Sequence, residues 1–143
     1  MTARAAIIGL TPEYGVAVKM INKTGSASVK GELVEVDSGV DNAFMLEEAG
    51  GNDCIGAVYT AGVADGDECL VVVGGVAEVL IEDGTAATRG YWVRTSTSVA
   101  GRADATTATP PGLVLSHFAE IGHCLESKSS GTDVLVKIIM HFN

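Results

Sequence analysis

Short apolar runs separated by turn residues dominate the chain between residues 54 and 82. The runs are rich in β-branched side chains, and glycine and aspartate stand between them, which is typical of consecutive antiparallel strands. Gly62 marks the first expected turn, and Gly74 with Gly75 marks the second. The three valines at 71–73 place apolar side chains on both faces, so the middle strand is expected to be buried on both sides. The pattern predicts a β-meander.

Further strands are predicted on both sides of this meander. Residues 96–112 form a polar stretch that is expected to be a long surface loop. No segment repeats its apolar residues at helical spacing over the length that a stable helix needs. The other predicted strands cover residues 16–22, 32–36, 43–46, 91–94, 113–118, 120–126 and 133–142. The predicted fold class is therefore all-β, a compact β-barrel or β-sandwich.

Two stretches of the chain match later stretches in the same order. Residues 55–73 align without a gap to residues 121–139, and residues 23–34 align to residues 82–93. Both alignments place glycines on glycines at expected turns, which indicates pseudo-repeated halves. The alternative is that small glycine-rich β-chains align to themselves by chance.

The predicted halves lie within one domain. The repeat halves are about 16–74 and 75–143, so residues 16–143 are expected to form a single β-domain. Residues 1–15 precede both copies and have little strand pattern. They are expected to form an extended N-terminal arm that becomes ordered against a partner.

The composition limits the partners of this domain. The chain is 47% hydrophobic but only 5% aromatic, so its core must consist of Val, Ile, Leu and Ala. The net charge of -9 argues against non-specific binding to nucleic acid and against an anionic membrane surface. The apolar stretch at residues 5–10 is too short for a signal peptide or a membrane span. We expect a protein made in a reducing cytoplasm.

The sequence contains little that points to catalysis or metal binding. Cys54, Cys69 and Cys124 are odd in number and lack metal-type spacing, so free buried thiols are expected. His123 precedes Cys124 on a predicted strand, where neighbours face opposite sides and cannot readily share an ion. No serine or cysteine lies in a recognisable nucleophile motif. The sequence predicts no enzyme, no metal and no cofactor.

Trp92 leaves one alternative open. As the only tryptophan, it could line a surface for a sugar or a peptide. A place in the core or in a subunit interface is favoured, because one face of its predicted strand must pack inward. A small-ligand or carbohydrate-binding β-domain is thus the alternative function, and an enzyme is the least favoured one.

Several motifs in the meander resemble those of a known family. The chain reads I-G-A-V, D-G-D, L-V-V-V, G-G-V-A-E-V and E-D-G in this order. In this respect it resembles the small phage capsid decoration (cement) proteins, and it is most similar to the lambda-type head decoration protein family. The resemblance extends from about Val16 onward. It implies a β-clip or β-tulip-like fold, a homo-oligomer with a trimer favoured, and attachment to the outside of an assembled capsid.

The same resemblance implies where contacts with the major capsid protein would lie. An N-terminal segment reaches that protein in several members of the family, and residues 1–15 would occupy its place here. The contacts would stabilise the shell by bridging neighbouring capsid proteins, which places the chain on the virion exterior. The residues expected to bind are Arg4, Ala5, Ala6, Ile7, Ile8 and Leu10 of the arm, with Thr109, Pro110 and Pro111 as a possible loop contact.

Overall fold

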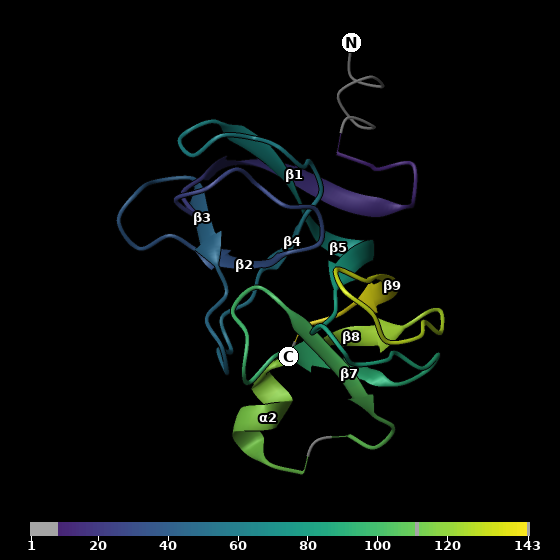
Figure 1. Cartoon of the computed structure of the whole chain (residues 1–143). Helices are drawn as coiled ribbons and strands as arrows, with labels where there is room; N and C mark the ends of the chain where they lie inside the picture. The colour runs from purple at the N-terminus through teal and green to yellow at the C-terminus, as the bar shows by residue number, and fades with distance from the viewer. Residues whose placement is uncertain (1–8, 111, 143) are drawn as a thin grey trace.

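The computed structural model describes residues 9–110 and 112–142 of the chain (Figure 1). The described residues form nine strands of one sheet and one short helix. The strands are β1 (Gly15–Asn22), β2 (Leu33–Val36), β3 (Ala43–Leu46), β4 (Gly56–Val58), β5 (Glu68–Leu80), β6 (Trp92–Thr95), β7 (Ala103–Thr107), β8 (Glu120–Cys124) and β9 (Leu135–Met140), and the helix is α2 (Val114–Phe118). The all-β prediction is confirmed.

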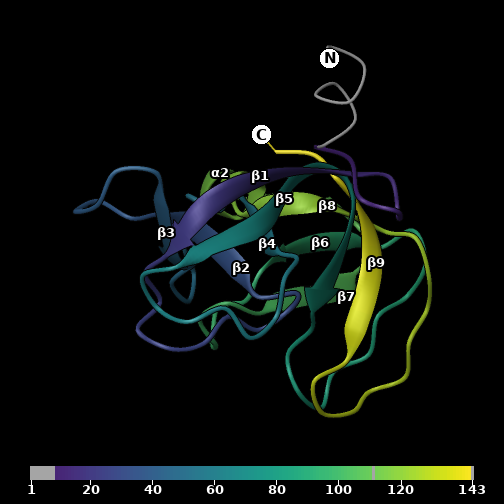
Figure 2. The ribbon, with the colours of Figure 1, turned by 90° about the horizontal axis from the view of Figure 1, so that it is seen from above.

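The sheet closes on itself twice. Its strand order is β1-β3-β2-β4-β5-β9-β8-β6-β7, and β1 also pairs with β5. Since β1 pairs with both β3 and β5, the strands β1 to β4 and the first part of β5 form a closed ring. A parallel bridge between Ile81 and Ala103 joins the end of β5 to β7 and closes a second ring with β6, β8 and β9. The result is two small β-barrels that share β5 (Figure 2).

The shared strand differs from the predicted meander. The turn predicted at Gly74 and Gly75 is wrong, because β5 runs through both glycines as one strand of 13 residues. Before them β5 pairs with β1 and β4, and after them it pairs with β9. Gly75 has a φ of +70°, and a side chain there would collide with the carbonyl oxygen of Tyr14. Glycine therefore bends the strand where it leaves one barrel for the other.

The two barrels repeat the same backbone hydrogen bonds. The amide of Gly31 donates to the carbonyl of Val58 at 2.8 Å, and the amide of Gly90 donates to the carbonyl of Cys124 at 2.9 Å. Gly31 and Gly90 lie 59 positions apart and have φ angles of +89° and +83°. The repeated structure agrees with the predicted pseudo-repeated halves.

Side chains also take part in this repeat. The Asp37 carboxylate accepts hydrogen bonds from the amides two and three residues further along the chain. The Ser96 hydroxyl oxygen, 59 positions later, accepts hydrogen bonds from the amides at the same two offsets. An aspartate and a serine thus stabilise the same turn in the two barrels.

The register of the last strand corrects the predicted alignment by one residue. The gapless alignment places Val72 on Ile138. In the structure Val72 pairs with Ala57 in the first barrel, and the equivalent pair in the second is Ile139 with His123. Val72 therefore corresponds to Ile139. Because a one-residue shift exchanges the two faces of a strand, this difference decides which side chains point into each barrel.

The interiors of the two barrels are filled by equivalent positions. All ten of these side chains are at most 3% exposed, and nine of the ten are aliphatic or thiol side chains. They are Val34, Phe44, Val58, Cys69 and Val71 in the first barrel, and Val93, Ala103, Cys124, Val136 and Ile138 in the second. Seven of the ten are Val, Ile or Ala, as predicted, whereas Phe44, Cys69 and Cys124 are residue types that the predicted core did not include.

Two predicted elements between β6 and β8 are wrong. Residues 96–112 are not a continuous loop, because they contain β7, where Ala103, Asp104 and Ala105 are buried. Residues 113–118 do not form a strand, because α2 takes their place. A short apolar run fits either a strand or a helix, and its periodicity does not separate the two. Within the described residues, no helix is long and apolar enough to cross a membrane.

Candidate binding surfaces

The most exposed apolar surface surrounds α2. Leu113, Val114 and Leu115 are 73%, 70% and 74% exposed, and Phe118 is 47% exposed. We call these four residues the α2 patch. No residue of α2 is buried. Contiguous exposed apolar side chains of this kind mark interaction surfaces in proteins.

The α2 patch does not follow from the repeated architecture. The connection between β7 and β8 is longer than the equivalent connection between β3 and β4, and α2 lies within it. The additional residues of the second half therefore lie in this helix and in the loop before it. Because the first barrel closes without such an insertion, the insertion is a candidate for function.

Two hollows lie beside α2. They measure about 250 and 160 Å³, and Arg94 and Ser116 line both. Arg94 forms an ion pair with Asp104 at 2.9 Å, so its charge is already partnered. Both hollows are smaller than the roughly 300–1,000 Å³ of typical small-molecule sites. Their form suits a side chain of a protein partner better than a whole small ligand.

The loop residues predicted to contact the capsid protein lie next to the α2 patch. Thr109 and Pro110 line the larger hollow together with Leu113. Pro111 lies outside the described residues. The described residues of the predicted loop contact therefore lie beside α2. The sequence did not predict this helix, because the pattern at residues 113–118 indicated a strand.

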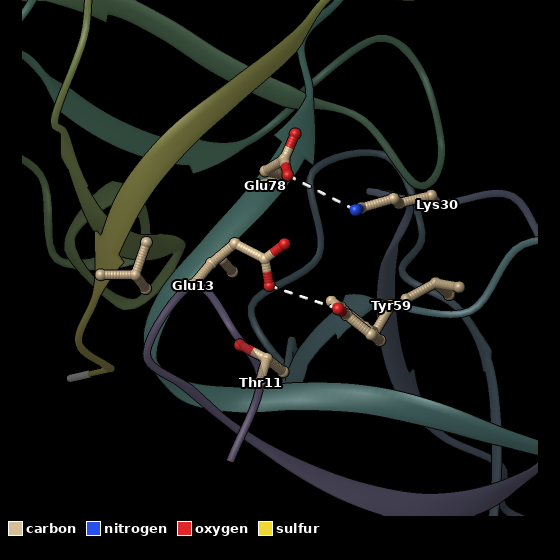
Figure 3. Close-up of a pocket in the computed structure, with 8 residues that line it drawn as sticks. Thr11, Glu13, Lys30, Tyr59 and Glu78 are labelled. Carbon is tan, nitrogen blue, oxygen red and sulfur yellow. Dashed lines mark hydrogen bonds and ion pairs between the residues drawn. The ribbon is translucent and has the colours of Figure 1, made fainter.

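The N-terminal turn lies against the domain. The Thr11 side chain is buried, and its hydroxyl accepts a hydrogen bond from the Gly15 amide at 2.9 Å. The Tyr59 hydroxyl donates to the Glu13 carboxylate at 3.2 Å, and Lys30 forms an ion pair with Glu78 beside them (Figure 3). Residues 9–14 thus contact the domain, whereas the sequence assigned them to an extended arm.

The pocket under this turn is already filled. It measures about 10 Å³, which leaves space for about one water molecule. The Glu13 pKa is lowered by a hydrogen bond from its own backbone amide and by the Tyr59 hydroxyl. The residues here therefore hold the turn in place and do not form a ligand site.

The predicted arm contacts are only partly described. Arg4, Ala5, Ala6, Ile7 and Ile8 lie outside the described residues. Leu10 pairs with Val16 and is 56% exposed.

A row of large side chains crosses the outer face of the second barrel. Trp92 pairs with His123, His123 pairs with Ile139, and Ile139 pairs with Val76 on four neighbouring strands. We call these four residues the Trp92 row. The ring centres of Trp92 and His123 are 4.2 Å apart, and His141 lies 4.9 Å from His123. Ile139 is 40% exposed, and the other three are half-buried.

The thiols and imidazoles do not form a metal site. His123 lies in the exposed row, whereas Cys124 points into the second barrel, as the strand alternation predicted. In the described part of the chain, no three His, Cys, Asp or Glu side chains are placed to hold a metal ion. The three cysteines are free, and burial raises the pKa of Cys54 to about 12 and that of Cys124 to about 11. Such thiols are poor nucleophiles.

Glu120 and Glu47 are almost fully buried. Glu120 is 1% exposed, and its carboxylate lies 3.4 Å from Nδ1 of His117, which links α2 to β8. Glu47 is also 1% exposed, and burial together with the nearby Glu35 carboxylate raises its pKa to about 7. One Glu47 oxygen accepts a hydrogen bond from the Asp53 amide at 3.3 Å. Glu47 is thus protonated in part at neutral pH.

Comparison with known proteins gives a structural match and no sequence match. No protein-family model and no curated protein matches the sequence. Among solved structures, the fold is similar to that of the head fiber gp8.5 N base in bacteriophage phi29, with a TM-score of 0.53 and 19% sequence identity. The match covers 88% of this chain and 93% of that chain. The two chains therefore share a fold over nearly their whole lengths.

Proposed function

We propose that this chain is a structural protein of a phage virion that binds the outer surface of the assembled capsid. Its partner is the major capsid protein, and it stabilises the shell by bridging neighbouring capsid proteins. The observation that carries the proposal is the fold shared with a phage head fiber base. Attachment to the outer surface and bridging are what the sequence resemblance to the lambda-type decoration family implies.

The α2 patch supplies a contact surface for this function. Its four apolar side chains project from an insertion that the fold does not need, beside two hollows of side-chain size. Burial of such side chains against a partner contributes about 25 cal/mol per Å² of apolar surface. A capsid presents many identical sites, so a modest contact at each one stabilises the whole shell.

The arm supplies the second contact. Ala5, Ala6, Ile7 and Ile8 could lie as an extended strand along an edge of the capsid protein, with Arg4 beside them. Ordering the arm costs about 1–2 kcal/mol per residue, which new hydrogen bonds and apolar burial must offset. Because residues 9–14 contact the domain, the proposed strand-like contact is confined to residues before Gly9.

Co-sedimentation tests the function. Capsids of the phage that encodes this chain are mixed with the purified chain and pelleted, and the bound copies are counted. We expect saturable binding by the natural chain. Binding by the double variant Leu113→Asp with Leu115→Asp should be weaker by about tenfold or more, because the charges prevent burial of the α2 patch.

The control is Val36→Asp, which places one such charge, half of that in the double variant, at a residue that is 57% exposed on the other barrel. It should bind as the natural chain does. Deletion of residues 2–8 separates the contribution of the arm from that of α2. A natural chain that does not pellet with capsids at any concentration overturns the proposal.

A further inference from the structure

The Trp92 row has a counterpart in the first barrel. There Leu33 pairs with Ala57, Ala57 with Val72, and Val72 with Ala17. The strands that carry these residues are equivalent to the strands that carry Trp92, His123, Ile139 and Val76. The two rows thus occupy the same place on the outer face of the two barrels.

The counterpart row is covered within the chain. Leu33 and Ala57 are 0% exposed, Val72 is 2% exposed and Ala17 is 9% exposed. All four belong to one core cluster together with residues of the second barrel, among them Ile121. The outer face of the first barrel is therefore an interface with the second barrel.

The Trp92 row remains accessible. Ile139 is 40% exposed where its equivalent, Val72, is 2% exposed. Each member of the Trp92 row is also larger than its buried equivalent, with Trp92 in the place of Leu33 and His123 in the place of Ala57. Solubility does not favour larger apolar side chains at the more accessible positions, and Trp is typical of contact surfaces.

We propose that the Trp92 row is the interface through which one copy of this chain binds a second copy. In the first barrel the equivalent face is covered by the second barrel of the same chain. A barrel of another copy is therefore the partner that fits the Trp92 row. The row itself contains no carboxylate, whereas the chain as a whole carries a net charge of -9. Two copies therefore repel each other less through a face without carboxylates than through an acidic face.

The proposal does not depend on capsid binding and is tested without capsids. Sedimentation velocity from about 1 to about 100 µM gives the dissociation constant of the self-association. Trp92 is the only tryptophan, so its emission reports on the row directly. On dilution we expect the emission to move to longer wavelength as the mass falls.

Ile139→Asp places a charge in the centre of the row, and Val36→Asp is the matched control. We expect the dissociation constant of Ile139→Asp to rise about tenfold or more, with that of Val36→Asp unchanged. Circular dichroism establishes whether Ile139→Asp is folded. If it is not, the emission of the natural chain on dilution decides.

Three outcomes would overturn the proposal. One is a natural chain that is monomeric throughout the concentration range. Another is a folded Ile139→Asp variant that self-associates like the natural chain. The third is self-association without any change in Trp92 emission, which would place the interface elsewhere.

Discussion

Gly56 and Gly122 occupy the same position in the two barrels, and each lies where a side chain would collide with a carbonyl of the neighbouring strand. At Gly56 the carbonyl belongs to Val72, and at Gly122 it belongs to Ile139. These two carbonyls are themselves equivalent in the repeat. The close approach of backbones is thus built into both barrels and explains why the I-G pair recurs in the sequence.

We therefore expect Gly56→Ala and Gly122→Ala to destabilise the fold, each by about 1–3 kcal/mol, because the methyl group forces strands apart. Gly74→Ala is the control, since no atom lies within 4 Å of the position its Cβ would take. Its effect should be within about 0.5 kcal/mol. Urea denaturation measures all three, and equal losses at Gly56 and Gly74 would contradict the explanation.

Glu47 gives the fold a pH dependence. Its pKa is raised from 4.5 to about 7, so the folded state binds a proton that the unfolded state has released. The stabilisation is complete below about pH 4.5 and declines as the pH rises to about 7, by up to about 3 kcal/mol. Glu47→Gln removes this loss and should be more stable than the natural chain above pH 7.

The control for this prediction is Glu48→Gln, because Glu48 is the exposed neighbour of Glu47. Chemical denaturation at about pH 5 and about pH 8 compares the three chains. If Glu47→Gln keeps the pH dependence of the natural chain, then Glu47 is not its source.

Truncation locates the start of the domain. Deletion of residues 2–14 removes the Thr11 hydrogen bond to Gly15 and the Tyr59 contact of Glu13. We expect it to lower the free energy of unfolding by about 1–3 kcal/mol. Deletion of residues 2–8 retains both contacts and should cost less. Equal melting temperatures for the two truncated chains would show that the turn contributes nothing to stability.

The chain is expected to form a trimer. The family that the sequence resembles is commonly trimeric, and the Trp92 row offers a surface for self-association. Light scattering coupled to size exclusion should therefore give a mass three times the 14.6 kDa of one chain. A dimer would be consistent with the Trp92 row as the interface but not with three copies. A strict monomer would contradict both predictions.

The strands could be predicted where turn residues separate short apolar runs. At residues 43–46 and 16–22, the observed strands β3 and β1 begin and end within one residue of the predicted bounds. The strand β7 could not be predicted in this way. Its sequence, A-D-A-T-T, has no bulky apolar residue, and it is buried because other parts of the domain cover it. Local pattern also failed at α2, where a run of apolar residues is exposed.

The candidate surfaces were harder to predict than the strands. Trp92, His123 and Ile139 become neighbours only through the register of three strands that are distant in sequence. The apolar pattern indicates which face of each strand is buried, but not by itself which residues of distant strands lie opposite one another. The repeat does carry a signal for these surfaces. Where the side chains at two equivalent positions differ in size and polarity, one lies on a covered face and the other on an open face.

The sharing of β5 makes the two barrels one mechanical body. Neighbouring domains usually meet at an interface about which they can rotate, but here a single backbone passes from one barrel into the other and is hydrogen-bonded in both. A pull on the first barrel is therefore carried through the backbone of β5 into the second. Under the proposed attachment to a capsid, β5 would therefore carry load from the barrel that contacts the shell to the barrel that does not.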